Sequence, residues 1–259
     1  MRLDLYQVDA FANTVFTGNP AAICPLDSWL ADDVLLRIAA ENNLSETAFF
    51  IPSTDGFHIR WFTPLTEVAL CGHATLASAY VLFEFLGYTQ QLIHFESKSG
   101  PLTVSRNDDL LTLNFPSQPA TQCSPPENLL NAFPTKPILI LKSEDYIFVF
   151  ENEQDVLNAT PNLEQLKEND LRGVIITAAS EQYDFVCRFF APNCGIDEDP
   201  VTGSAYTQLY PYWSEILNKT KMHAHQLSKR GGDVWLDQNQ DRVLISGKAV
   251  LYMCGKINI

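Results

Sequence analysis

Basic residues are scarce in this sequence. Its 259 residues include 17 lysines and arginines against 31 aspartates and glutamates, a formal net charge of −14 at pH 7. Such a chain repels the phosphate backbone of DNA or RNA, because binding to that backbone depends on positive charge. Nucleic acid is therefore not an expected partner.

Paired cysteines and long apolar runs are also missing. No apolar run approaches the roughly 18 residues that a membrane-spanning helix needs, and the opening MRLDLYQVDAF carries acids where a signal peptide would be apolar. No CxxC pair and no metal-type spacing occurs among the six cysteines, which are Cys24, Cys71, Cys123, Cys187, Cys194 and Cys254. The pair His223 and His225 has no third ligand nearby, so no metal is expected. We expect reduced thiols in a cytoplasmic protein that does not contact a membrane.

What the sequence does contain is a globular composition, 46% hydrophobic and 19% charged, arranged as an internal repeat. RWFTP (60–64) matches RFFAP (188–192), and GHAT (72–75) matches GSAY (203–206). A repeat of about half the chain length predicts two similar domains. We place them at 1–117 and 118–259, with the final strand either staying in the second domain or returning to the first.

The repeat continues into a predicted hairpin in each half. Residues 100–115 match residues 232–247, pairing Gly100 with Gly232 and Asp109 with Asp241. Each half therefore reads as a strand, a loop, a helix that begins at a glycine, and a hairpin. The proline-rich interval 116–137 is interpreted as the link between the halves.

The run GIDEDPVTGSAY (195–206) is the most informative stretch of the second half. We expect Asp197, Glu198 and Asp199 to lie where a loop enters a helix, with Pro200 in the first turn. Gly203 and Ser204 would then present backbone N–H groups to an anion. The alternative is a capped loop whose acids are solvated.

Three polar residues stand out in the first half. Glu46 interrupts an apolar strand predicted at 44–52, where it either faces water or is buried, and burial would raise its pKa toward that of a proton-transferring base. His73 follows Gly72 at the start of a helix that is apolar nearly all round, and either caps or packs there or does chemistry. Asn19 lies in a turn and either contacts a ligand or only serves the turn.

Several motifs occur in order across nearly the whole chain: VDAF (8–11), GNPAA (18–22), LSETAFF (44–50), RWFTP (60–64), LCGHAT (70–75) and GIDEDPVTGSA (195–205). With these motifs the sequence resembles the PhzF family, the phenazine-biosynthesis-type isomerases. The resemblance implies an α+β fold like that of diaminopimelate epimerase, with two pseudo-symmetric domains, each a barrel-like sheet around a central helix.

The resemblance also implies a function and a site. Glu46 corresponds to the catalytic acid/base of the family, and His73, Asp199 and Ser204 to its supporting polar residues. The backbone at Gly72–His73 and Gly203–Ser204 corresponds to a clamp for the substrate carboxylate, with Asn19 as a further contact. The implied protein is a homodimeric, cofactor-independent isomerase without a metal, which moves a proton between carbons of a small carboxylate in an inter-domain cleft.

Two other functions remain open from the sequence. Cys71 stands where related epimerases carry one of two catalytic thiols, so a two-base racemase of an amino acid is one alternative. A family member that only binds a ligand or a protein is the other. The sequence departs from the family pattern at Tyr206, where many members have histidine, and the neighbouring wall of the site is expected to differ.

Overall fold

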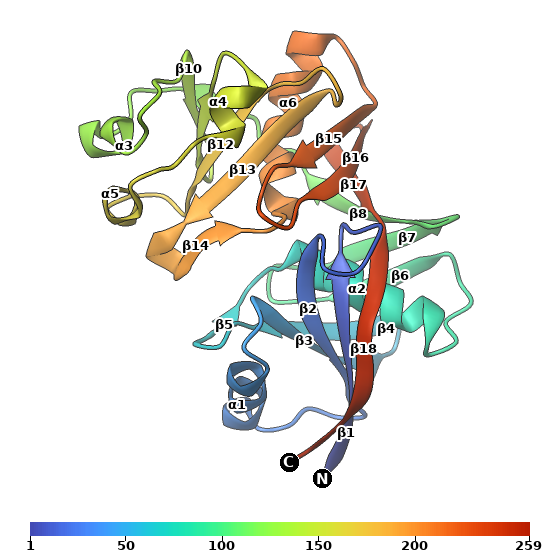
Figure 1. The fold of residues 1–259 in the computed structure, drawn as a ribbon. Helices are drawn as coiled ribbons and strands as arrows, with labels where there is room; N and C mark the ends of the chain where they lie inside the picture. Colours follow the sequence, from blue (N-terminus) through green and yellow to red (C-terminus); the bar gives the residue numbers. More distant parts are fainter. The chain divides into compact units, whose positions relative to one another are not determined.

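The computed structural model describes all 259 residues as a mixed α+β protein with two compact units. Unit 1 comprises Met1–Asn114 and Ser246–Ile259, and unit 2 comprises Phe115–Ile245 (Figure 1). The boundary between the halves thus lies between residues 114 and 115, slightly before the expected position. The final strand belongs to unit 1.

Unit 1 is one sheet with two helices. Its elements are β1 (Arg2–Ala10), β2 (Asn19–Pro25), α1 (Asp32–Asn42), β3 (Glu46–Ser53), β4 (Gly56–Phe62), β5 (Glu67–Val68), α2 (Gly72–Glu84), β6 (Leu92–Glu96), β7 (Leu102–Asn107), β8 (Leu110–Pro116) and β18 (Ala249–Asn258). The strands pair in the order β18, β1, β2, β3, β4, β6, β7, β8, with β5 added to the end of β4. Because β18 pairs with β1 over its whole length, the two termini lie side by side (Figure 1).

Helix α2 is the core of unit 1. It contacts β1, β2, β3, β7 and β18, and nine of its thirteen residues are buried. Its buried hydroxyls do not disrupt it, because Thr75 and Ser78 donate to the carbonyls of Cys71 and Ala74 one turn earlier. An all-round apolar sequence therefore forms a helix enclosed by its own sheet, as predicted.

Unit 2 begins at Phe115, directly before the interval 116–137 that was interpreted as a link. Its elements are β9 (Thr121–Gln122), α3 (Glu127–Asn131), β10 (Leu139–Lys142), β11 (Tyr146–Val149), α4 (Glu153–Leu157), α5 (Leu163–Lys167), β12 (Val174–Ala179), β13 (Phe185–Ala191), the 3-10 turn η1 (Pro192–Cys194), β14 (Ile196–Asp199), the 3-10 turn η2 (Gly203–Ala205), α6 (Tyr206–Leu217), β15 (Met222–Gln226), β16 (Gly232–Asn239) and β17 (Arg242–Gly247). The prolines at 116–137 thus do not form a free linker, because Leu129 and Phe133 from this interval are buried in the core of the unit.

The repeat is present in the strand pairing of both units. From β1 to β7 the successive pairs are antiparallel, parallel, antiparallel, parallel and antiparallel. From β10 to β16 the same sequence of directions recurs. The two hairpin turns match as well, with Asp108 and Gln240 both in the left-handed region at φ 54° and 58°. The prediction of two pseudo-symmetric halves is confirmed.

An ion pair is duplicated along with the strands. Arg60 makes a two-pronged contact with Glu67 and lies over the Phe62 ring, 5.1 Å from its centre. Arg188 contacts Glu198 in the same way and lies 5.0 Å from the centre of the Phe190 ring. Each arginine is thereby fixed by a bidentate charge contact and an aromatic face.

This pairing corrects the expectation for residues 197–199. They form strand β14, which pairs with β13, and they do not enter a helix. Glu198 forms an ion pair with Arg188 on β13. Pro200 lies between β14 and η2 instead of in a first helical turn. The expected helix start at Gly203 is a 3-10 turn, and the α-helix begins at Tyr206.

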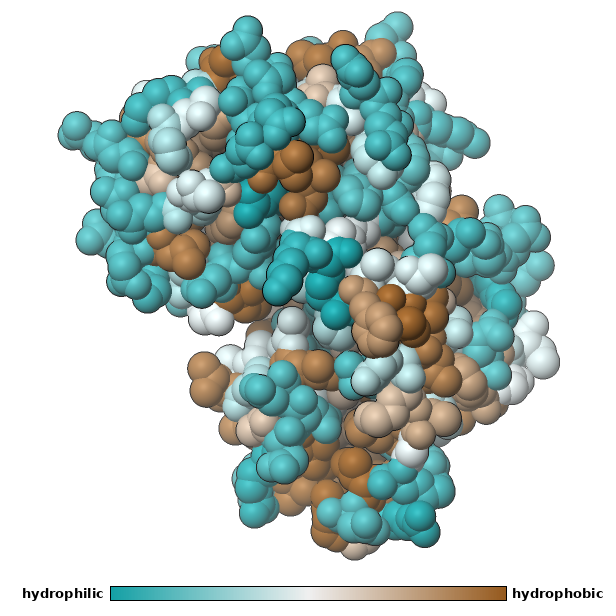
Figure 2. Space-filling view, in the orientation of Figure 1, coloured by the Kyte–Doolittle hydropathy of each residue, from teal (hydrophilic) through white to brown (hydrophobic).

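The visible face of the molecule carries both hydrophilic and hydrophobic residues (Figure 2). On the face shown in Figure 2, teal residues cover much of the surface and brown hydrophobic residues form separate patches. None of the helices combines the length and the apolar character that a membrane crossing requires. All six cysteines are unpaired with one another.

Candidate active site

Glu46 is buried in unit 1. It begins β3, a strand flanked by the parallel β2 and the antiparallel β4, and it is only 8% exposed. The residues that follow it, Thr47 to Phe50, are almost completely enclosed. The sequence left open whether Glu46 faces water or is buried. In the structure it is buried, and a buried carboxylate requires polar partners.

His73 supplies such a partner from the first turn of α2. Its Nε2 lies 3.2 Å from Oε2 of Glu46, and both side chains are about one-tenth exposed or less. Burial lowers the pKa of His73 from 6.5 to about 3, because the surroundings disfavour the charged ring. The imidazole is accordingly neutral at physiological pH.

Asn19 determines which nitrogen of that neutral ring carries the hydrogen. The Asn19 side chain is fully buried at the start of β2, with Nδ2 3.3 Å from Nδ1 of His73. An amide nitrogen can only donate, so Nδ1 accepts and the hydrogen resides on Nε2. The Nε2–H group of His73 is then the side of the ring that lies next to the Glu46 carboxylate, 3.2 Å from Oε2.

The loop before Asn19 explains why the motif VDAF precedes it. The buried Asp9 accepts a hydrogen bond of 2.9 Å from the Phe16 backbone, which holds the loop against β1. Gly18 has φ 65°, and a Cβ on it would approach the Ala10 carbonyl oxygen to 2.2 Å. Only glycine fits this close turn, and the turn places Asn19 opposite Ala10 in the β1–β2 pair.

Cys71 lies beside the same histidine. Its sulfur is 3.5 Å from Nδ1 of His73, and the residue is 6% exposed. Together with Glu46 and His73 it offers a sulfur, a nitrogen and an oxygen within 4.8 Å of one another. A thiolate, an imidazole and a carboxylate are donors suited to zinc, so this trio is the group in the chain that could hold a metal ion.

Unit 2 contains the remaining predicted residues. Asp199 ends β14 and is 7% exposed, and its carboxylate accepts a hydrogen bond from the hydroxyl of Thr202. Gln226 braces this turn, because its side chain donates to the Asp199 carbonyl and accepts from the Thr202 backbone N–H. Ser204 follows in η2 and is partly exposed.

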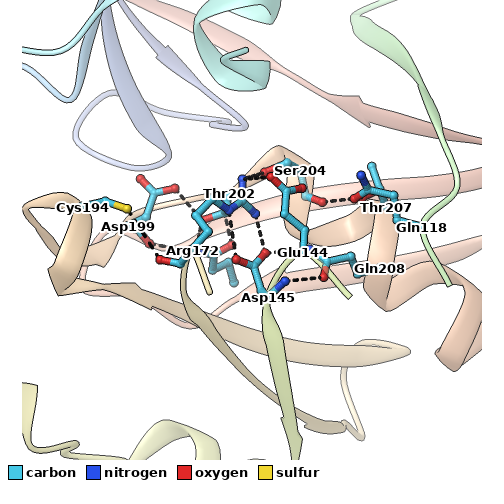
Figure 3. A network of polar contacts seen from close by, with 11 residues as sticks. Gln118, Glu144, Asp145, Arg172, Cys194, Asp199, Thr202, Ser204, Thr207 and Gln208 are labelled. Carbon is cyan, nitrogen blue, oxygen red and sulfur yellow. Dashed lines mark hydrogen bonds and ion pairs between the residues drawn. The ribbon is translucent and has the colours of Figure 1, made fainter. Parts of the chain in front are cut away.

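Arg172 was missed by the sequence reasoning, although it contacts Ser204. Its Nη1 donates to the Ser204 hydroxyl oxygen over 2.9 Å, while Nε and Nη2 bind the two oxygens of Asp145 (Figure 3). The partners are far apart in sequence, so no local motif marks the group. The available cue was an arginine directly before an apolar strand in a chain poor in basic residues.

Tyr206 does not face a ligand space. Its side chain is fully buried, and its hydroxyl accepts from the thiol of Cys187, 3.5 Å away. The ring packs at 6.2 Å from Phe185 in the core of unit 2. Tyr206 is therefore a core residue of unit 2, and the expectation of a different site wall stays a prediction.

The structure thus brings Asn19, Glu46 and His73 together in unit 1, next to Gly72 at the start of α2. In unit 2 it brings Asp199 close to Thr202, and Ser204 follows Gly203 in η2. Two repeated halves of this kind, each with polar residues at the start of a buried helix, define an epimerase-like α+β protein.

The comparison with known proteins gives the family. The model described as "Phenazine biosynthesis-like protein" matches residues 8–255. The chain therefore belongs to the phenazine biosynthesis-like, or PhzF, family.

Relatives match over their full length. An uncharacterized isomerase of Pseudomonas aeruginosa is 47% identical over 259 residues, covering 100% of both chains. Phenazine biosynthesis-like domain-containing protein 1 of Mus musculus is 40% identical over 287 residues, covering 99% of both. The crystal structure of a PhzF family protein of Enterococcus faecalis superposes with a TM-score of 0.97 at 43% identity, covering 100% of both chains.

More distant structures share the fold alone. A hydroxyproline epimerase of Agrobacterium vitis has a TM-score of 0.62 at 9% identity, covering 99% of this chain and 92% of that chain. The epimerase-like fold expected from the sequence is thereby confirmed. Homologues named as isomerases support isomerase activity in the family.

Proposed function

We propose that the protein is a cofactor-independent isomerase that moves a proton between two carbons of a small carboxylate, with Glu46 as general acid/base. The observation that carries the proposal is the contact between the buried Glu46 carboxylate and the neutral ring of His73, 3.2 Å apart. A neutral ring beside the carboxylate does not supply the full positive charge that would make it a weaker base.

The proposed isomerisation needs no oxidant or reductant. Glu46 takes a proton as the carbon–hydrogen bond breaks, and the electron pair moves into the adjacent unsaturated system. The protonated Glu46 then returns a proton to another carbon of the same system. Negative charge that develops next to the substrate carboxylate would be stabilised by the backbone N–H groups of Gly72 and His73, which have no carbonyl one turn earlier in α2 to bind.

Asn19, Asp199 and Ser204 have supporting roles in this proposal. Asn19 keeps the hydrogen of His73 on Nε2, so that the ring presents an N–H group, and not a lone pair, to Glu46. Asp199 and Ser204 are proposed as residues on which turnover depends, with Gly203 providing a backbone N–H for the substrate carboxylate. The protein is further proposed to act as a homodimer in the cytoplasm.

A two-thiol racemase is less well supported. Cys71 directly precedes Gly72, and the residue that precedes the equivalent Gly203 is Thr202. The hydroxyl of Thr202 is engaged by Asp199. A second thiol is therefore missing at the matching position of the repeat.

The proposal is tested by proton exchange with solvent. The protein is incubated in D₂O with a panel of small carboxylic acids that have a carbon–hydrogen bond next to a carbon–carbon double bond, and deuterium uptake is followed by NMR. At least one compound is expected to gain deuterium as its double bond shifts. Inversion at one carbon without such a shift would support the racemase, and binding without any exchange would support a ligand-binding role.

A further inference from the structure

Arg172 lies one residue before the position of the repeat that is equivalent to Glu46. Thr47 pairs with Phe62 in unit 1, and Val174 pairs with Phe190 in unit 2, so Glu46 is equivalent to Gly173. The same repeat makes His73 equivalent to Ser204. In unit 1 the first helical turn therefore contacts an acid from the strand end, whereas in unit 2 it contacts Arg172, one residue before the equivalent position.

The glycine at the equivalent position explains this difference. A Cβ on Gly173 would lie 2.6 Å from the Phe189 ring and 2.8 Å from the Phe190 carbonyl, so no carboxylate side chain fits there. Phe189 also lies against the guanidinium of Arg172, with 5.2 Å from the ring centre to the central carbon. The same aromatic ring thus excludes an acid and supports a cation.

Asp145 holds the guanidinium group of Arg172 in place. It is fully buried, and it binds Nε and Nη2 of Arg172 with its two oxygens. Gln208 from α6 donates to the same carboxylate over 2.7 Å and accepts the Asp145 backbone N–H over 3.0 Å (Figure 3). A buried charge with a bidentate partner and an added amide contact has one well-defined geometry.

The consequence concerns the hydroxyl of Ser204. Its oxygen accepts from the Arg172 cation, so its own hydrogen must point elsewhere. Within the chain the Ser204 hydroxyl is hydrogen-bonded to Arg172, and Ser204 is partly exposed. A hydroxyl in this state is polarised by the cation and is able to donate to an acceptor from outside the chain.

We propose that Arg172 is a positioning residue that turns Ser204 into a hydrogen-bond donor for the carboxylate of the substrate. The proposal rests on the proposed function insofar as the acceptor is a substrate carboxylate. Arg172 itself remains bound to Asp145, and Ser204 makes the contact together with the neighbouring backbone N–H groups. Ser204 and Arg172 of unit 2 thereby provide recognition of an anion.

The test uses inorganic sulfate, so it does not depend on turnover. Sulfate is titrated into ¹⁵N-labelled protein, and the dissociation constant is obtained from the shifts of the Gly203 and Ser204 backbone amides. The wild type is expected to show saturable shifts there. Arg172→Met and Ser204→Ala are each expected to raise the dissociation constant about tenfold, as expected for the loss of a charge-assisted hydrogen bond.

Further variants separate positioning from general charge and from folding. Arg172→Met in the Ser204→Ala background should change the constant by less than about twofold, because the two residues act through one hydrogen bond. Arg172→Lys keeps the charge beside Asp145 but cannot reach Ser204 at the same time, and about a threefold weakening is expected. Arg188→Met is the matched control, because Arg188 also pairs with an acid and an aromatic ring in unit 2 but does not contact Ser204.

Three outcomes would overturn the proposal: no sulfate shift at Gly203 and Ser204 in the wild type, an unchanged constant in Arg172→Met and Arg172→Lys, or an undiminished effect of Arg172→Met when Ser204 is alanine. The last outcome would mean that Arg172 attracts the anion directly. Failure of the isomerase proposal would instead be seen as absent deuterium exchange, with the sulfate results unaffected.

Discussion

Nε2 of His73 lies 3.2 Å from Oε2 of Glu46, and Asn19 on the other side of the ring assigns the hydrogen of His73 to that nitrogen. The contact joins the first turn of α2 to the start of β3 and is enclosed by the core of unit 1. His73 is thereby a neutral ring with its N–H next to the buried Glu46 carboxyl group.

The neutral state of His73 predicts how stability depends on pH. The folded-state pKa of about 3 lies below the ordinary value of 6.5, so between these values the unfolded chain binds a proton that the folded chain does not. Stability is therefore lost as the pH falls from 6.5 toward 3. Relative to His73→Gln, the wild type should lose up to about 1.4 kcal/mol more per pH unit in this window.

Urea unfolding at several pH values measures this difference in slope. His94→Gln is the control for the exchange of a histidine for glutamine, because His94 is exposed on β6. Parallel stability curves for the wild type and His73→Gln would contradict the neutral, buried histidine.

Cys71 is predicted to be a packing residue. Its sulfur is close to His73, but no thiol occupies the equivalent position in unit 2. Cys71→Ser and Cys71→Ala should cost on the order of 1 kcal/mol of stability and keep deuterium exchange within about threefold of the wild type. The matched variant Cys24→Ala, in a buried position of β2, controls for the loss of a core sulfur. A well-folded Cys71 variant without exchange activity would favour the racemase.

Chelation separates proton chemistry from metal chemistry at the trio of Glu46, Cys71 and His73. In the proposed mechanism Glu46 transfers a proton without a metal ion, so dialysis against EDTA should leave deuterium exchange unchanged. Added Zn²⁺ should compete for the same atoms and reduce exchange, because all three donors lie within 4.8 Å of one another. Activity that disappears with EDTA and returns with Zn²⁺ would contradict a metal-independent reaction.

The repeat made the fold predictable from the sequence. The surroundings of single residues were harder to predict. Matching segments such as RWFTP and RFFAP predicted a duplicated strand and a duplicated buried helix start. The strand directions of both units agree with this prediction. An acid in an apolar strand is compatible with either face of a sheet, so the burial of Glu46 did not follow from alternation alone. It depends on β2 and β4 flanking β3.

The acidic run shows where local pattern was misleading. Three acids before a proline and a glycine are typical of a helix entrance, but Glu198 is held by Arg188 and the segment joins β13 as a strand. Arg172 was missed for a related reason: Asp145, Arg172 and Ser204 meet only in the folded chain. Tertiary pairing of charges overrides local preference in both cases.

The role of Glu46 is tested most directly by deuterium exchange in Glu46→Gln, with a carboxylate that the wild type isomerises. The amide keeps the shape of the side chain but cannot take a proton, so exchange should fall by about two to four orders of magnitude while the protein remains folded. Glu84→Gln at the other end of α2, where Glu84 pairs with the exposed Arg106, should retain wild-type exchange within about twofold. Undiminished exchange in a folded Glu46→Gln variant would contradict the assignment of Glu46 as the acid/base.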